Sequence, residues 1–141
     1  LQLVLDVGKR HRLWVVHHGC EAMRPIIPDL MEMGVDVLHL PHTTSPGMDP
    51  LELKREFGDR LSFLGGLDTH NVLAAGTADD VRRATRRLLD GMAADQGGYV
   101  LAASRGIPPH IPVDNVFAML AEAGIRREEI FDRAAEVRHN R

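Results

Sequence analysis

The sequence predicts an α/β protein built on a parallel sheet, and two observations lead to this class. Short apolar runs alternate with amphipathic segments of helical spacing, four times in succession, which implies crossover connections between parallel strands. Polar residues able to do chemistry follow each predicted strand, as they do at the carboxyl ends of TIM-barrel strands. Four units make half of such a barrel. We therefore expect one partial domain over residues 1–141, made of TIM-barrel-type (β/α) units with helices outside the sheet.

Each predicted strand is a short apolar run bounded by turn residues. The first reads LWVVH, and the third, LSFLGGL, contains Gly65 and Gly66, which suggests that a backbone or a ligand approaches closely there. No GxGxxG pattern follows any strand, so the main sequence sign of a dinucleotide site is missing. The predicted strands are 13–17, 35–40, 61–67 and 99–104.

Helix signals stand between the strands. Pro25 lies in the first turn of one helix, Asp49 and Pro50 open the next, and Thr77 is a good N-cap with Asp80 three residues later. The helix that Thr77 opens carries four arginines beside two aspartates, which predicts a solvated outer face paired at i,i+4 rather than an anion site. The predicted helices are 1–9, 25–34, 49–58, 77–95, 112–124 and 126–141.

Composition excludes several classes of function. The net charge of -3 and an aromatic content of 4% favour neither a phosphate-binding groove nor a base-stacking platform, so nucleic acid is not an expected partner. No apolar run approaches the roughly 18 residues that span a bilayer, and no signal peptide is evident. We expect a cytoplasmic protein whose single cysteine, Cys20, is a reduced thiol.

The segment VVHHGC, residues 15–20, carries the sharpest chemical signal. If the strand continues in extended form, His18 and Cys20 point to the same side and can converge on one ion. Imidazole and thiolate are ligands that zinc prefers, although an active zinc site needs about three protein ligands. The other reading is that Cys20 is a small buried residue and His18 a hydrogen-bonded loop histidine.

Three further strand ends carry candidate residues. Asp68 and His70 can form a general acid–base pair, or Asp68 or Thr69 can simply cap a short helical turn. His39 is a possible ligand or substrate contact. Arg105, next to Ser104, can bind a carboxylate through two hydrogen bonds or can be an ordinary solvated arginine.

The segments 17–40, 49–83 and 97–123, with the motifs just described, resemble the C-terminal half of the uroporphyrinogen decarboxylase superfamily. The resemblance runs from about His11 to Ala123 and implies the last four strands of a TIM barrel. One branch of that superfamily decarboxylates a tetrapyrrole in haem biosynthesis without a cofactor. The other contains corrinoid-dependent methyltransferases that bind zinc through an HxC motif and a later cysteine, and His18 and Cys20 match that motif.

One departure from the family pattern concerns the last strand. Arg105 stands where the methyltransferases have cysteine and the decarboxylases have histidine, and arginine cannot ligate zinc. Either Glu21, His39 or His70 completes a zinc site, or Arg105 holds an anionic part of the substrate and zinc is weak or absent.

We therefore expect a zinc-dependent, corrinoid-linked methyltransferase that acts on a small molecule and has a corrinoid protein as its partner. His18 and Cys20 would hold zinc, Asp68 and His70 would serve catalysis, and Arg105, Ser104 and His39 would bind substrate. The alternatives are a metal-free decarboxylase and a non-catalytic half barrel. Because half a barrel leaves two open strand edges, we also expect pairing with an N-terminal half or with a second copy.

Overall fold

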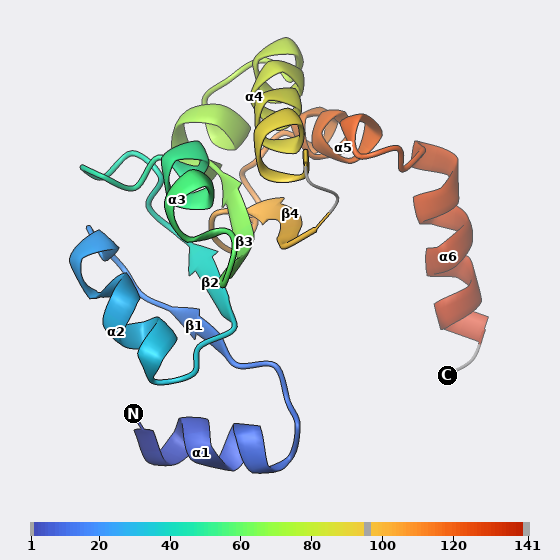
Figure 1. Ribbon diagram of the computed structural model, residues 1–141. Coiled ribbons are helices and arrows are strands. Elements are labelled where there is room, and N and C mark those ends of the chain that lie inside the picture. The colour runs from blue at the N-terminus through green and yellow to red at the C-terminus, as the bar shows by residue number, and fades with distance from the viewer. Residues whose placement is uncertain (1, 95–96, 140–141) are drawn as a thin grey trace.

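The computed structural model describes residues 2–94 and 97–139, with side chains described as far as residue 133. Four parallel strands form one sheet in the order β1-β2-β3-β4, so neighbours in the sheet are also neighbours in sequence (Figure 1). This unreversed order is that of TIM-barrel units and confirms the predicted class. The strands are β1 (Val16–His18), β2 (Val37–Leu40), β3 (Ser62–Leu67) and β4 (Tyr99–Ala103).

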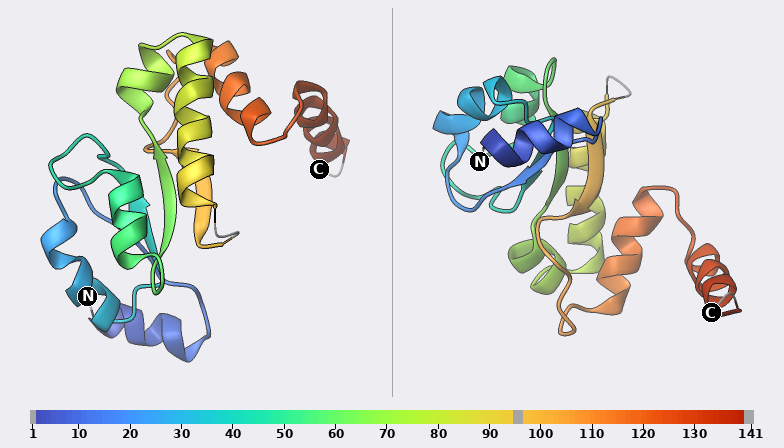
Figure 2. Two further views of the ribbon diagram at one scale, coloured as in Figure 1. Left: turned by 45° about the horizontal axis from the view of Figure 1, so that its top comes forward. Right: turned by 90° about the horizontal axis from the view of Figure 1, so that it is seen from below.

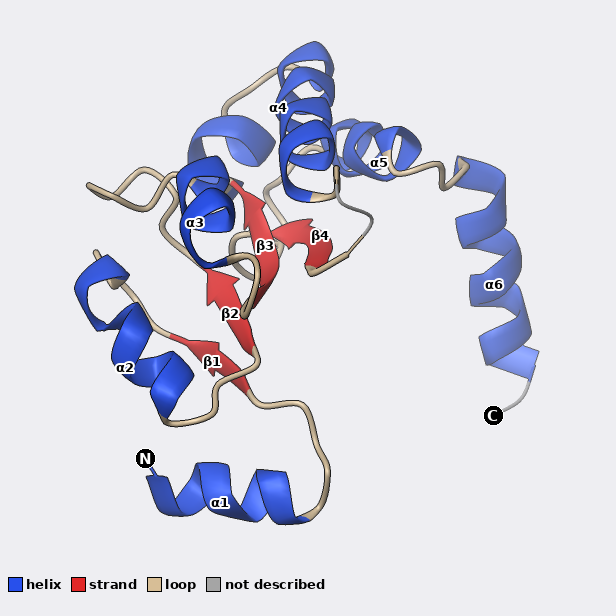
Figure 3. Cartoon of the chain, viewed as in Figure 1, coloured by secondary structure: helices blue, strands red, loops and turns tan. Residues whose placement is uncertain are grey.

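Helices connect the strands, and α2, α3 and α4 follow one another along one face of the sheet (Figures 1 and 2). In Figure 3, α2 is drawn beside β1, α3 beside β3 and α4 above β4, and α6 stands apart on the far side of α5. None of the helices in the described part of the chain is both long and apolar enough to cross a bilayer. The helices are α1 (Gln2–Arg10), η1 (Arg24–Ile26), α2 (Ile27–Glu32), α3 (Pro50–Phe57), η2 (Thr69–Ala74), α4 (Ala78–Met92), α5 (Val113–Glu122) and α6 (Arg127–His139).

The core lies between the sheet and this helical layer. Leu38, Leu40 and Phe63 of the strands are fully buried, and Val81 and Met92 of α4 are buried with them. Burial of such side chains contributes about 1.5–3 kcal/mol each relative to exposure, so this one-sided layer is the main source of stability.

The first strand is shorter than the sequence predicts and starts later, at Val16 instead of residue 13. Val16 lies opposite Val37, the first residue of β2, so Leu13 and Trp14 fall before the point where pairing begins. Trp14 is 80% exposed as a result. The segment at 25–34 also differs, because Pro25 and Pro28 divide it into a short 3-10 turn, η1, and the six-residue α2.

Within the described residues, β1 and β4 each pair with one strand only, so each has an open edge. Large apolar side chains are exposed beside both edges. Near β1 they include Leu13, Trp14 and Val16, and β4 contributes Val100, which is 58% exposed. An open, apolar strand edge favours pairing with further strands.

Candidate functional site

The carboxyl ends of the four strands form one edge of the sheet, and every predicted site residue lies at or just beyond it. His18 ends β1, His39 lies in β2, Asp68 follows β3 and Ser104 follows β4. The parallel topology therefore brings together residues that are far apart in the sequence.

The closest polar contact across the strands joins two histidines. His18 lies opposite His39 in the register of β1 and β2. Their Nδ1 atoms are 2.7 Å apart and their ring centroids 4.7 Å apart. Partial burial lowers the pKa of His39, and the charge of His18 lowers it further. The lowered pKa favours the neutral form of the His39 ring, and one of the two facing nitrogens can donate its hydrogen to the lone pair of the other.

Gly65 provides the space that the His39 ring occupies. A Cβ atom at this position would lie 2.9 Å from Cδ2 of His39 and 3.3 Å from the carbonyl oxygen of Ala103. The sequence predicts the close approach of a backbone or a ligand at this glycine; the structure places the His39 side chain nearest to it, with the backbone carbonyl of Ala103 slightly farther away.

Asp68 caps the helix that follows β3. Its Oδ1 accepts the backbone N–H groups of His70 at 2.8 Å and Asn71 at 2.9 Å, and its Oδ2 accepts the Asn71 side-chain amide at 2.7 Å. Partial burial acts to raise the pKa of Asp68, but the hydrogen bonds from Asn71 and His70 outweigh it and hold the pKa below its usual value. The carboxylate is thus ionised and accepts three hydrogen bonds. General acid–base catalysis by Asp68 with the exposed His70 stays a prediction.

Ser104 and Thr69 link the ends of β4 and β3 through their hydroxyl groups. Both residues are buried, and their side-chain oxygens are 3.1 Å apart. The Ser104 hydroxyl also accepts the backbone N–H of Thr69 at 3.2 Å, and the Thr69 hydroxyl accepts the backbone N–H of Arg105 at 3.1 Å. The sequence suggests Thr69 only as an alternative helix cap and not as a site residue, although it stands between two predicted site residues.

The Arg105 side chain reaches across the end of the sheet to the loop after β2, where its guanidinium contacts Nε2 of His42. His42 is half-buried. The positive charge of the Arg105 guanidinium therefore lies at the edge of the site, and its contact there is an imidazole ring rather than a carboxylate that would neutralise it.

The donor atoms at this edge are of types that zinc prefers, but they are too few for a complete zinc site. The chain offers the imidazoles of His18 and His39 side by side, with the exposed thiol of Cys20 two residues beyond His18. The strand ends at His18, so the alternation that would align Cys20 with it does not extend that far. Throughout the described residues, no three His, Cys, Asp or Glu side chains are grouped so that they could hold a metal ion.

A cavity of about 220 Å³ opens at the same end of the sheet, on the side covered by α3 and α4. Asp68 and Gly66 form part of its wall from the sheet, and Thr43 and Arg87 line it from the surrounding elements. Arg87 is ion-paired with Asp49 at 2.6 Å there.

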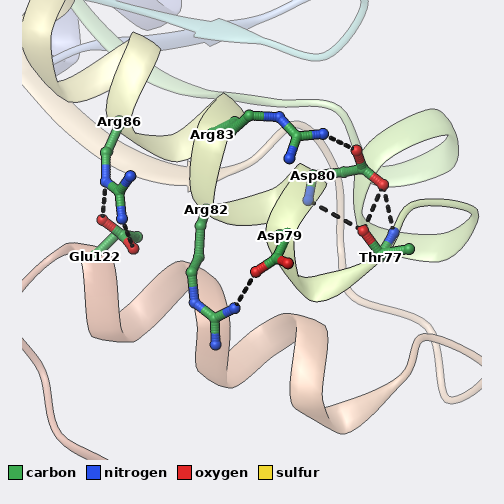
Figure 4. Close-up of polar contacts among 7 residues, drawn as sticks. All are labelled: Thr77, Asp79, Asp80, Arg82, Arg83, Arg86 and Glu122. Atoms are coloured by element: carbon green, nitrogen blue, oxygen red, sulfur yellow. Dashed lines mark hydrogen bonds and ion pairs between the residues drawn. The ribbon is translucent and has the colours of Figure 1, made fainter.

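The arginine-rich face of α4 is paired, as the sequence predicts, but with different spacing (Figure 4). Arg82 and Arg83 pair with Asp79 and Asp80 at i,i+3, not i,i+4. Arg86 instead reaches Glu122 of α5 with two hydrogen bonds of 2.8 and 2.9 Å. The arginines thus stabilise the helix start and its packing on α5.

Comparison with known proteins gives a consistent family. A model of the uroporphyrinogen decarboxylase (URO-D) family matches residues 2–124. Two curated relatives from Methanosarcina barkeri, both named methylcobamide:CoM methyltransferase MtaA, are 28% identical to the chain over 106 residues, which is 75% of this chain and 29% of theirs. A solved structure described as a methyltransferase from Methanosarcina mazei matches with a TM-score of 0.70 and 25% identity, over 88% of this chain and 35% of that one.

The chain thus spans less than a third of the length of these curated relatives. The family match, by contrast, includes all four strands and every predicted site residue from His18 to Arg105. The chain belongs to the uroporphyrinogen decarboxylase (URO-D) family.

Proposed function

We propose that the chain is the C-terminal half of the barrel of a zinc-dependent methyltransferase that transfers a methyl group between a corrinoid and a thiol. The observation that carries this proposal is the HxC sequence at the carboxyl end of β1, with the imidazole nitrogen of His39 2.7 Å from that of His18. The methyltransferase names of the relatives and of the similar structure support the same activity.

In this proposal His18 and Cys20 are two of the zinc ligands. When bound, zinc would act as a Lewis acid that keeps a substrate thiol deprotonated at neutral pH. His39 lies beside His18 and is the nearest further donor to it. Cys20 is exposed, so its thiol is accessible from the end of the sheet.

The remaining residues bind and orient the substrate. The Arg105 guanidinium, beside His42, would bind an anionic group of the thiol substrate by charge-assisted hydrogen bonds. Asp68 and His70 would hold or move a proton near the thiol. A methylated corrinoid would supply the methyl group as co-substrate: the substrate thiolate would form the carbon–sulfur bond, and the corrinoid would leave with the electron pair of the broken bond.

The open edges of β1 and β4 support a second part of the proposal, that a further half barrel completes the site. The exposed Trp14 and Val16 at one edge and Val100 at the other would be covered when added strands close the sheet. Arginine stands at the position of the third family ligand, so the added half or His39 would complete the zinc site.

Zinc content tests this function directly. We expect about one zinc per chain in the purified wild-type protein by plasma mass spectrometry, and its loss in His18→Ala and Cys20→Ser. His110→Ala is the matched control, since His110 is exposed and follows the last strand of the site. Zinc that persists in both ligand variants, or no zinc in the wild type even after reconstitution with the N-terminal half barrel, would reject the assignment.

A second candidate is a metal-free decarboxylase in which Arg105 anchors a substrate carboxylate. The contact between Arg105 and His42 favours it, because it places a cation at the site without any metal. The Cys20→Ser variant separates the two functions, since it abolishes methyl transfer and leaves decarboxylation almost unchanged.

A further inference from the structure

We propose that Thr69 is a positioning residue, whose side-chain hydroxyl fixes the backbone of Arg105 and thereby sets where the guanidinium meets an anion. This inference rests on the proposed role of Arg105 in substrate binding. Thr69 does not contact the guanidinium itself. It acts only through the backbone N–H of Arg105, which its hydroxyl accepts.

The position of Thr69 suits this role. It is the first residue of η2, it follows the capping residue Asp68, and it is 2% exposed. The two N–H groups that Asp68 accepts fix the start of η2, so the Thr69 side chain projects from a rigid turn. A group that is to hold another in place needs such support.

The hydrogen bonds around Thr69 form a crossed pair between two strand ends. The Thr69 hydroxyl accepts the backbone N–H of Arg105, and the Ser104 hydroxyl accepts the backbone N–H of Thr69. The hydroxyl oxygens are 3.1 Å apart, so one O–H donates to the other. Ser104 itself is tied to β3 by its backbone N–H, which donates to the carbonyl of Leu67 at 2.7 Å.

Loss of the Thr69 hydroxyl would have a specific consequence. The N–H of Arg105 would lose its acceptor in a part-buried position, which costs free energy until the loop moves to satisfy it. The loop that moves is the one that carries the guanidinium. Ser104 is 3% exposed, and its hydroxyl is hydrogen-bonded to Thr69. In this proposal Arg105, rather than Ser104, therefore contacts the substrate.

The Arg105 guanidinium is available to an anion. Across the side chains that the structure describes, no carboxylate forms an ion pair with it, and its contact is with the ring of His42. On α4, by contrast, Arg82 and Arg86 are each paired with a carboxylate. An unneutralised guanidinium beside an imidazole binds carboxylate or sulfonate groups.

The test compares binding of two thiols to the full chain by calorimetry or NMR titration. Mercaptopropionate carries a carboxylate, and mercaptoethanol, which lacks a charge, is the control ligand. We expect the wild type to prefer mercaptopropionate, and Thr69→Val to lose about tenfold in affinity for it, as expected from one misplaced charge-assisted hydrogen bond. Thr69→Ser, which restores the hydroxyl, should recover wild-type binding.

Thr85→Val is the matched control variant, because Thr85 is also a buried threonine but lies in α4, away from Arg105. It should leave binding unchanged. A folded Thr69→Val protein that binds mercaptopropionate as tightly as the wild type would overturn the positioning role. A wild type with no preference between the two thiols would instead overturn the proposed role of Arg105.

Amide exchange in the wild type gives a second test that needs no variant. The N–H of Arg105 should exchange with solvent more slowly than that of Gly106, the next and exposed residue in the loop. Equal exchange at the two positions would show that the Thr69 hydroxyl does not hold Arg105, even if Thr69→Val fails to fold.

Discussion

The imidazole ring of His39 lies against the backbone of Gly65, where a Cβ atom would come within 2.9 Å of the ring carbon Cδ2 and 3.0 Å of Nε2. Gly65 also has a φ of +92°, a conformation that L residues with side chains rarely adopt. The glycine thus makes the contact between His18 and His39 possible from the neighbouring strand.

Replacing Gly65 with alanine should both destabilise the protein and displace the His39 ring. The left-handed backbone alone costs about 1–3 kcal/mol, and the clash with the ring adds to this cost. Denaturant unfolding measures the loss, and histidine NMR signals report whether the two rings separate. Gly106→Ala is the control, because a Cβ there meets nothing within 4 Å. Equal stability of the two variants would contradict the role assigned to Gly65.

Replacing Thr85 with valine should stabilise the protein by about 1 kcal/mol. The Thr85 side chain is fully buried in α4, and within the described residues its Oγ1 has no hydrogen-bond partner. Valine has the same shape and removes the cost of burying an unpaired hydroxyl. Thermal unfolding of Thr85→Val beside Thr69→Val checks this, because the hydroxyl of Thr69 is bonded and its loss should lower the stability. A lower Tm for Thr85→Val would show that the hydroxyl has an acceptor.

Asp49 should make stability depend on pH on the acid side. It caps α3 by accepting the N–H groups of Leu51 and Glu52, and its other oxygen accepts from Arg87 of α4 at 2.6 Å. Burial acts to raise the pKa of Asp49, but the Arg87 and backbone hydrogen bonds outweigh it and the pKa is lowered. The unfolded chain therefore takes up the proton more readily, so the stabilisation is present above the usual aspartate pKa of about 4 and is lost as pH falls through the lowered value.

The Asp49→Asn variant isolates this contribution. Asparagine still caps a helix, so the expected loss near neutral pH is below about 1 kcal/mol, since water screens a pair of which the Asp49 side chain is 38% exposed. The difference from wild type should shrink as pH falls below about 4. Asp59→Asn, at an exposed aspartate, is the control in urea unfolding at several pH values. A difference that does not change with pH would contradict the assignment.

Local signals in the sequence predicted the fold well. Thr77 and Asp80 form the expected capping box, with the Thr77 hydroxyl accepting the Asp80 N–H and the Asp80 carboxylate accepting the Thr77 N–H. The start of α3 at Asp49 is likewise as predicted. These features depend on residues two or three positions apart, which a sequence displays directly. The limits of β1 depend instead on where β2 begins, and the prediction was wrong there.

The arrangement of the site could be predicted only in part. The sequence predicts that the residues able to do chemistry lie at the strand ends. It pairs His18 with Cys20 as zinc ligands, however, and predicts that His39 contacts the substrate. The contact between His18 and His39 follows from the register of two strands, which no local pattern encodes. Thr69 was missed for a similar reason, since its partner Ser104 is on the next strand.

The sequential order of the strands also bears on how the chain acquires its structure. Val16 pairs with Val37, Val37 with Ser62, and Phe63 with Tyr99, so each pairing joins a strand to the next one along the chain. Among the four described strands no pairing joins the first to the last, and loop closure is modest at each of their pairings. These four units can therefore dock one after another, in chain order, as they leave the ribosome.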